Sequence, residues 1–579
     1  MLARLQILKI SSLAHVRHVL LITAGVLMPL NWNAPNAFSA NTLDPTVLTK
    51  YEDTMPIPGV MPSVGKLNGV PFYKVGMTQI SQFLHKYFED NNLPTTLWGY
   101  GPPNDSGGFD GSYQGPTFEV RKNRRIKVEW INALPSTHLL PIDRTIHGAD
   151  FMDPNDPNSG PAPDVRTVVH LHGGHVESAS DGNAEAWFTA GFAQTGRSFK
   201  KRTYSYSNTQ QAATLLYHDH ALGITRLNVY AGLAGFYLIR DTFEDNLNLP
   251  KGEFEIPILI QDRSFNDDGS LYYPADEDKG VELSIVPEFF GNTAVVNGKV
   301  WPKLEVEPRK YRIRFLNGSN ARFYNMQLFV DGNLNESGPV FHQIGTDGGL
   351  LEKPVPINGR LLLAPGERAD VIINFSGFEG KSLILHNNAK SPFKGVDTID
   401  DPEVGDEEPL PEIMKFVVNS SVSEPDTSSL PSKLKKLKRI PESSAASKRT
   451  LTLNEGVDGY GRMMLLLNNS EFSDPITEEP KLGTNEIWSL TNQTSNVHPI
   501  HLHLVQFQIL DRQAIMPDPP RIQPDANEDG WKDTVRVNPG EVTRVIAHFD
   551  IAGLFLWHCH ILEHEDHEMM RPFKVIKRR

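Results

Sequence analysis

Along most of the chain, apolar and polar residues alternate in short runs. Residues 117–120 and 126–131 show this alternation, and residues 256–260 and 311–315 form further runs rich in isoleucine and aromatic side chains. A period of two places alternate side chains on one face of a β-strand. Long stretches with helical spacing are hard to find, so we predict an all-β fold.

Turn-forming residues separate the predicted strands. The chain has 45 glycines and 43 prolines, and many of them stand with Asn and Asp between the apolar runs. Many short strands joined by such turns are typical of β-sandwich domains. With 579 residues, the chain is long enough for three or four domains with large cores.

Changes in composition divide the chain into segments. Residues 41–245 and 448–579 carry the histidine motifs described below, whereas residues 246–418 hold only scattered histidines, so we expect no metal in this middle domain. Residues 419–447 are rich in Ser and Pro and contain the basic run 433–439. We interpret 419–447 as a solvated linker. Docking of its lysines to a membrane or a polyanion is an alternative.

The first forty residues have a composition of their own. Arg4, Lys9 and Arg17 precede the apolar run 19–30, and small residues follow up to Ala40. This order is typical of a secretory signal peptide, which predicts export to the periplasm or the extracellular space. The run is short for a bilayer, so we expect no stable membrane insertion. An N-terminal membrane anchor is the alternative.

Charge and cysteine content narrow the choice of partners. The formal net charge is −14, which argues against a nucleic-acid partner. Cys559 is the only cysteine, so no intrachain disulfide can form. A lone cysteine is usually a small buried apolar residue, and its surroundings decide whether it does more.

Histidines cluster strongly around that cysteine and in three other windows. Twelve of the 20 histidines lie in residues 170–175, 218–220, 498–503 and 558–567. Even scattering of core histidines does not produce such clusters, so a metal-binding function is favoured. His175, beyond the turn at Gly173 and Gly174, is expected to lie at the surface or behind the ligands.

The spacing of the residues around Cys559 suggests two kinds of metal site. Cys559, His564 and Met569 supply most of a blue-copper site, which uses two imidazoles, a thiolate and a weak thioether. In an extended strand, Cys559 faces one way while His558 and His560 face the other. The sequence therefore predicts two metal sites on opposite faces of one strand.

The four motifs together resemble the copper signature of the multicopper oxidases. Residues 217–232, 296–302 and 560–566 are similar to the branch that contains bacterial spore-coat laccases and bilirubin oxidases. The resemblance covers nearly all of the predicted mature chain. It implies three cupredoxin-like Greek-key β-sandwich domains, four copper ions and dioxygen as electron acceptor, and we expect a monomer.

The resemblance also implies a role for each motif residue. The type 1 copper ligands would be His498, Cys559, His564 and Met569, and the type 2 ligands would be His170 and His501. One type 3 copper would be held by His172, His218 and His560, and the other by His220, His503 and His558. Electrons would arrive at the ring edge of His564, and Glu565 and Asp181 would supply protons; ordinary surface acids are the alternative for those two. Phe290 stands where the spore-coat laccase has a disulfide cysteine.

These implications favour a laccase-like oxidase of phenolic or similar organic reductants. A metallo-oxidase acting on Cu(I), Fe(II) or Mn(II), or a bilirubin oxidase, is the alternative within the family. The 13 methionines form no dense run of the kind that cuprous and ferrous oxidases often carry. An electron-transfer cupredoxin, a copper-storage protein and a nitrite reductase are disfavoured, because none of them needs both the thiolate site and the histidine cluster.

Overall fold

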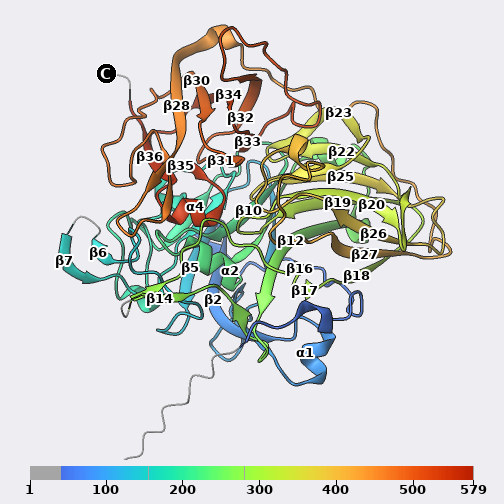
Figure 1. Ribbon diagram of the computed structural model, residues 1–579. Coiled ribbons are helices and arrows are strands. Elements are labelled where there is room, and N and C mark those ends of the chain that lie inside the picture. Colours follow the sequence, from blue (N-terminus) through green and yellow to red (C-terminus); the bar gives the residue numbers. More distant parts are fainter. Residues whose placement is uncertain (1–40, 154–155, 279–280, 578–579) are drawn as a thin grey trace, which may run out of the picture. The chain divides into compact units, whose positions relative to one another are not determined.

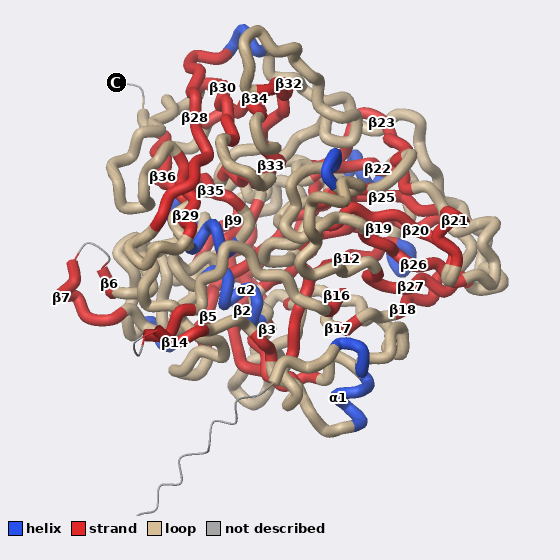
Figure 2. Tube along the Cα trace, viewed as in Figure 1, coloured by secondary structure: helices blue, strands red, loops and turns tan. Residues whose placement is uncertain are grey.

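The computed structural model of this protein describes residues 41–153, 156–278 and 281–577, and the predicted signal peptide lies outside them. In the described part, strands form eight sheets, two of which have only two strands, and helices are short (Figures 1 and 2). The prediction of an all-β fold is therefore confirmed. None of the helices in the described part has the length and apolar character needed to cross a bilayer.

Two sheets are built from the N-terminal strands. One has the order β1 (Gly65–Leu67), β2 (Val70–Gln82), β5 (Ile126–Ala133), β9 (Thr203–Tyr206), with β3 (Thr95–Gly101) paired to β2. The other has the order β4 (Gly115–Arg121), β11 (Ala234–Arg240), β10 (Ala213–Asp219), β8 (Val169–His172). We call this pair of sheets the first sandwich.

The middle strands form the two sheets of a second sandwich. One sheet has the order β17 (Lys299–Val300), β16 (Thr293–Val296), β12 (Glu255–Phe265), β19 (Lys310–Asn317), β25 (Arg368–Asn374), β22 (Phe341–Thr346), β23 (Gly349–Ile357), and β13 (Leu271–Tyr272) pairs with β12. The other has the order β18 (Lys303–Val306), β27 (Glu412–Val418), β26 (Ser382–Asn387), β20 (Tyr324–Val330), β21 (Asn333–Ser337), and β24 (Leu361–Leu363) pairs with β20.

The C-terminal strands form a third sandwich. Its sheets have the orders β29 (Met463–Leu467), β28 (Ala445–Val457), β30 (Thr484–Asn492), β34 (Glu541–Phe549), β32 (Phe507–Ala514) and β33 (Thr534–Val537), β31 (His498–Leu502), β35 (Gly553–Cys559), β36 (Met570–Val575). The two-stranded sheets are β6 (Phe151–Asp153) with β7 (Asp156–Pro161) and β14 (Asp276–Asp278) with β15 (Val281–Leu283). The α-helices are α1 (Lys86–Asp90), α2 (Thr225–Ala231), α3 (Thr242–Asp245) and α4 (Leu562–Asp566).

The apolar runs of the sequence become these strands. Residues 117–120 lie in β4 and 126–131 in β5, where Ile126, Val128 and Trp130 are buried and the intervening residues are half-buried. Residues 256–260 and 311–315 lie in β12 and β19, which pair in parallel and are buried along nearly their whole length. The chain passes from one sandwich to the next between β11 and β12 and between β27 and β28, and the domain boundaries given above remain a prediction.

The segment predicted to be a solvated linker has no strand from residue 419 until β28 begins at Ala445, but it is not solvated throughout. Leu434 and Leu437 are 7% and 5% exposed. The Leu434 N–H donates a hydrogen bond to the backbone oxygen of Glu352 on β23 (2.8 Å). The segment therefore packs along the second sandwich, because its leucines lose contact with water there.

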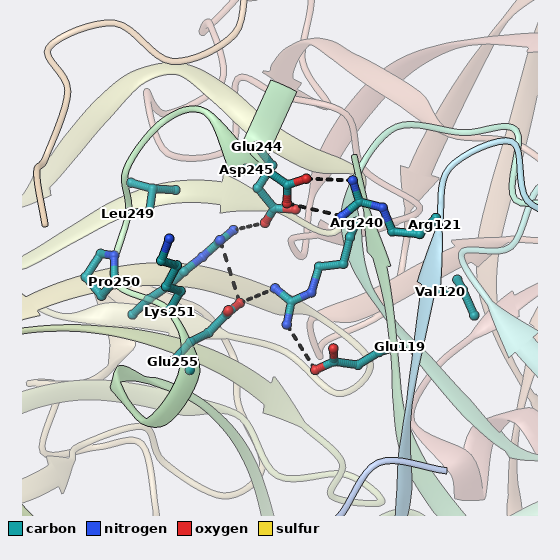
Figure 3. Close-up of a pocket in the computed structure, with 12 residues that line it drawn as sticks. Glu119, Val120, Arg121, Arg240, Glu244, Asp245, Leu249, Pro250, Lys251 and Glu255 are labelled. Carbon is teal, nitrogen blue, oxygen red and sulfur yellow. Dashed lines mark hydrogen bonds and ion pairs between the residues drawn. The ribbon is translucent and has the colours of Figure 1, made fainter. Parts of the chain in front are cut away.

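The first and second sandwiches meet through apolar and charged contacts. Leu216 and Phe236 on β10 and β11 pack in one buried cluster with Leu259 and Leu316 on β12 and β19. Beside this cluster, Arg240 on β11 lies between Glu119 (3.1 Å) and Glu255 (2.5 Å), as Figure 3 shows.

Arg314 on β19 is a buried cation at this junction. Its side chain is 2% exposed and contacts Glu255 (2.6 Å), Glu244 on α3 (2.8 Å) and Asp370 on β25 (3.3 Å). A second hydrogen bond runs from its Nη1 to Thr214 Oγ1 on β10 (2.6 Å). Three carboxylates therefore contact the Arg314 guanidinium in a site that excludes water.

We expect Arg314→Met to lower the free energy of unfolding by up to about 3–5 kcal/mol, because it removes one of the guanidiniums that neutralise three buried carboxylates. Arg121→Met is the control, since Arg121 pairs with Asp245 beside Glu244 and the two side chains are 48% and 47% exposed. An exposed pair of this kind contributes about 0–1 kcal/mol. Thermal unfolding of both variants measures the difference, and equal midpoints would contradict the prediction.

Candidate metal centre

Two antiparallel strand pairs bring most of the motif histidines together. In the first sandwich, β8 pairs with β10, and His170 stands opposite His218. In the third sandwich, β31 pairs with β35, and His501 stands opposite His558. His220, His503 and His560 follow directly after these strands. Adjacent strands place such partners side by side, so each pair of strands presents a row of imidazoles.

The two rows face one another across the junction of the first and third sandwiches. Four of the groups whose ligand atoms lie within 4.8 Å of one another contain motif residues alone: His170, His172, His501; His172, His218, His560; His220, His503, His558; and His498, Cys559, His564. All of these residues are buried. His172 belongs to two groups, so geometry alone leaves open which of the two it would serve.

Six of the eight cluster imidazoles have an acceptor on the nitrogen that faces away from the cluster. Four use backbone oxygens through Nδ1: His170 to Asp181 (2.5 Å), His218 to Asp219 (2.8 Å), His501 to Asp533 (2.8 Å) and His558 to Cys559 (3.0 Å). His503 donates from Nδ1 to the carboxylate of Asp181 (2.7 Å). An acceptor on one nitrogen fixes the ring and leaves the other nitrogen with a lone pair for a metal.

The nitrogens that face inward are short of partners. Nε2 of His558 lies 3.2 Å from Nε2 of both His220 and His503, and Nε2 of His170 lies 3.4 Å from that of His501. His218 Nε2 and both nitrogens of His560 are buried without a hydrogen-bond partner. Converging imidazole lone pairs without donors suit transition-metal ions such as copper.

His172 is turned the other way. Its Nε2 contacts Asp533 Oδ1 and Thr534 Oγ1, both at 3.0 Å, and its Nδ1 is the nitrogen without a partner. Gly173 follows with φ +82°, and a Cβ there would lie 2.4 Å from Asp533 Oδ2. Only glycine allows the chain to turn this close to the carboxylate that holds His172.

Burial keeps the cluster histidines neutral. It lowers the pKa of His218 to about 4 and that of His220 to about 3, and it lowers the pKa of His170, His501 and His503 well below the usual value, with neighbouring imidazoles adding to the effect. A neutral imidazole is the form that binds a metal. A metal ion can therefore bind to these imidazoles without displacing a proton from them.

The thiolate group is separate and has a different composition. Cys559 Sγ lies 3.6 Å from Nδ1 of both His498 and His564. Thr494 Oγ1 holds the other nitrogen of His498 at 2.7 Å. Burial raises the pKa of the Cys559 thiol well above its usual value, so a metal has to replace the thiol proton when it binds.

Met569 is tied to this group through the backbone. It is fully buried, its carbonyl oxygen accepts from the Cys559 N–H (3.0 Å), and its own N–H donates to the His564 carbonyl (2.8 Å). Cys559 and Met569 also belong to one apolar cluster. A site with few polar neighbours suits soft sulfur donors.

Asp181 and Glu565, expected from the sequence, both lie beside the histidine cluster. Burial raises the pKa of Asp181 well above its usual value. Burial also acts on Glu565, but its interactions with the imidazoles of His558 and then His220 outweigh burial and hold the pKa of Glu565 below its usual range. Glu565 Oε2 lies 3.1 Å from His558 Nδ1, and Oε1 lies 3.4 Å from His220 Nδ1.

Glu565 lies in helix α4. Asp566 fixes this helix to the first sandwich by accepting from the N–H groups of Thr225 (3.0 Å) and Arg226 (2.9 Å), where α2 begins. Glu563 fixes it to the second sandwich by accepting from Asn320 Nδ2 (2.9 Å). Glu565 reaches the cluster because α4 is held at both places.

The sequence did not identify several residues that the structure brings to these sites. Asp533 holds His172, Thr494 holds His498, and Glu288 Oε1 lies 3.6 Å from the outer nitrogen of His564. Burial and the charge of Glu563 raise the pKa of Glu288 to about 8. No local pattern marks Asp533 or Glu288, because each contacts a residue far away in the chain, and Thr494 lies four residues before His498. His175 pairs with Asp550 at the surface (2.8 Å) and joins no group.

Comparisons with known proteins agree with this geometry. Multicopper oxidase family profiles match residues 158–243 and 442–579. A laccase of Bacillus subtilis is 45% identical over 91% of this chain and 99% of its own length. A laccase of Haloferax volcanii is 39% identical over 96% of this chain and 90% of its own.

A solved structure is also similar. The multicopper oxidase McoA of Aquifex aeolicus superimposes with a TM-score of 0.68 at 26% identity, covering 91% of this chain and all of that one. The sandwiches described above therefore correspond to the cupredoxin domains of such enzymes. Sequence identity over nearly the whole length, together with the buried histidine cluster and the thiolate group, shows that this chain belongs to the multicopper oxidase family.

Proposed function

We propose that this protein is a laccase, which takes single electrons from phenolic or similar organic reductants and uses four of them to convert dioxygen to water. The observation that carries the proposal is the position of Cys559 between His558 and His560. The Cys559 thiol belongs to the thiolate group, and the imidazoles of His558 and His560 belong to the histidine cluster. One short piece of backbone therefore joins an electron-accepting site to a site with room for several metal ions. The laccases of Bacillus subtilis and Haloferax volcanii support the assignment.

In this proposal, each group of ligands binds a copper ion of a defined type. Copper, when bound, supplies one-electron chemistry at the thiolate site and dioxygen reduction at the imidazole cluster. His498, Cys559, His564 and Met569 hold type 1 copper, and His170 and His501 hold type 2 copper. His172, His218 and His560 hold one type 3 copper, and His220, His503 and His558 hold the other. The same trios appear in the structure, with His172 assigned to type 3 copper by its likeness to the family.

The protein's own residues orient the ligands and supply protons. The outer nitrogen of His503 donates to Asp181, and that of His172 donates to Asp533. Glu565 faces the outer nitrogen of His558. These contacts hold the three rings in place. Reduction of dioxygen to water also consumes protons. Glu565 carries two oxygens at the cluster that have no hydrogen-bond partner in the described part of the chain, so we assign proton transfer to this carboxyl, with Asp181 as the second candidate.

Export completes the proposal. We propose export to the periplasm or the extracellular space, and the composition of residues 1–40 is the only support for it. We also propose that the oxidase acts as a monomer.

The first test replaces the thiolate. We expect Cys559→Ser to abolish the blue colour and the turnover of phenols and to leave one copper fewer per chain, because the intense absorption needs a copper–thiolate bond. Visible spectra and copper analysis of the purified holoenzyme measure this. His175→Ala is the control and should stay blue. An unchanged spectrum in the serine variant would refute the type 1 assignment.

The second test concerns protons. We expect Glu565→Gln to leave reduction of the type 1 site at its normal rate and to slow reoxidation by dioxygen by about 10²-fold, because the amide cannot transfer a proton. Stopped-flow absorbance follows both half-reactions. If Asp181→Asn slows reoxidation and Glu565→Gln does not, the proton role belongs to Asp181 and Glu565 only orients His558.

A metallo-oxidase is the second candidate, and Glu288 is the observation that favours it. This buried carboxyl lies beside the outer nitrogen of His564 and accepts from Asn496 Nδ2 (3.0 Å). The acid-rich loop 397–408 lies nearby, since Phe393 accepts a hydrogen bond from Val497 (3.2 Å) and the charge of Glu407 acts on Glu288. The negative electrostatic field of these carboxylates, when they are ionised, raises the local concentration of cations.

The KM values for a metal ion and for a phenol separate the two candidates. At a pH above about 8, where the Glu288 carboxyl is ionised, we expect Glu288→Gln to raise the KM for Fe(II) or Mn(II) about tenfold if such ions are reductants, because the amide lacks the negative charge that attracts a cation. The KM for a neutral phenol in the same variant serves as the internal control. Equal changes for both kinds of reductant would remove the case for a metallo-oxidase.

A further inference from the structure

The basic run Lys433–Arg439 takes no part in the copper sites. In the structure it lies along the edge strand β23, where the N–H groups of Leu434 and Lys435 donate to the backbone oxygens of Glu352 (2.8 Å) and Leu351 (3.2 Å). The Leu437 N–H donates to Glu352 Oε1 (2.9 Å). With Leu434 and Leu437 buried, the run is held in one conformation on the second sandwich.

The cationic side chains of this run point away from the buried leucines. Lys433, Lys436 and Lys438 are exposed, and within the described part of the chain none of them forms an ion pair. Lys435 lies 3.5 Å from Asp241, and Arg439 pairs with Asp529. Three lysines of the run therefore keep an uncompensated charge.

A groove of about 800 Å³ lies beside the run. Its floor is apolar and includes Leu351, Val355 and Leu434, and its rim carries Lys353, Lys433, Lys436 and Arg439. Two acids also line it: Asp529 pairs with Arg439, and Glu352 accepts from the Leu437 N–H but keeps its charge, so four cations face two carboxylates. This concavity is thus cationic, although the whole chain has a net charge of −14.

We propose that this groove binds a linear polymer of phosphate groups. Ammonium groups are compact charges without the planar fork of arginine, so they attract phosphates without demanding one fixed geometry. A concave groove admits a flexible chain, whereas a flat bilayer cannot enter it. None of the described residues that line the groove is aromatic, and binding of single-stranded nucleic acid relies on base stacking. A base-free polyphosphate chain therefore fits better than either a membrane or a nucleic acid.

Such binding would hold the oxidase at an anionic polymer and leave the copper sites free, because the groove shares no residue with them. The acidic remainder of the surface repels the polymer and so fixes the orientation of the protein on it. The inference is independent of which reductant the enzyme uses.

Labelled inorganic polyphosphate and the holoenzyme provide the test, with binding measured by fluorescence anisotropy. We expect the triple variant K353Q/K433Q/K436Q to bind at least about tenfold more weakly, because neutralised phosphate contacts supply most of the affinity in such complexes. The matched control is K66Q/K200Q/K574Q, which removes three exposed lysines elsewhere and changes the net charge equally. It should bind as the wild type does, and phenol oxidation should be unchanged in both variants. Wild-type binding should also weaken as salt is raised.

Four results would overturn the proposal. These are absence of wild-type binding at low salt, equal weakening in both triple variants, single-stranded DNA of the same charge binding as tightly as polyphosphate, and capture of the protein by anionic phospholipid vesicles but not by polyphosphate. The last two would assign the groove to a nucleic acid and to a membrane surface, respectively.

Discussion

Burial of a neutral imidazole cluster is the constraint on which the rest of this structure depends. Eight histidines lie where a charged ring would be costly, and burial lowers the pKa of most of them so that they stay neutral. A buried neutral ring still needs an acceptor for its one N–H. The acceptors are backbone oxygens and a few carboxylates, and they come from the first and the third sandwich. The two sandwiches can therefore dock in only one arrangement that satisfies both rows of rings.

The second sandwich contributes to this arrangement without supplying a motif residue. Arg368 on β25 is fully buried and pairs with Asp533, whose Oδ1 holds His172 in the first sandwich. Asn320, also from the second sandwich, holds Glu563 on α4. Removing a cation from Asp533 would leave a buried carboxylate beside the cluster, which is costly. The middle domain is thus more than a spacer, because it neutralises and positions groups that face the metal ligands.

Helix α4 joins the two kinds of site. It carries His564 of the thiolate group and Glu565 of the histidine cluster on consecutive positions, and Asp566 and Glu563 anchor it to the first and second sandwiches. Strand β35 makes the same connection through Cys559 and His558. Two short segments near the C-terminus therefore determine how electrons and protons would pass between the sites, and their anchoring residues fix the distances.

Much of this protein was determined by local sequence. The period of the apolar runs predicted the strands, since side chains on a strand alternate whatever the rest of the chain does. The same alternation predicted that Cys559 faces one site while His558 and His560 face another, and the histidine motifs identified the ligand types. Tertiary structure alone decided which histidines share a group, which nitrogen of His172 faces inward, and that Glu565 reaches His220 from a helix. It also brought Asp533 and Glu288 to their places. These features arise from contacts between residues distant along the chain, and the packing of three sandwiches, not the spacing of any motif, sets such contacts.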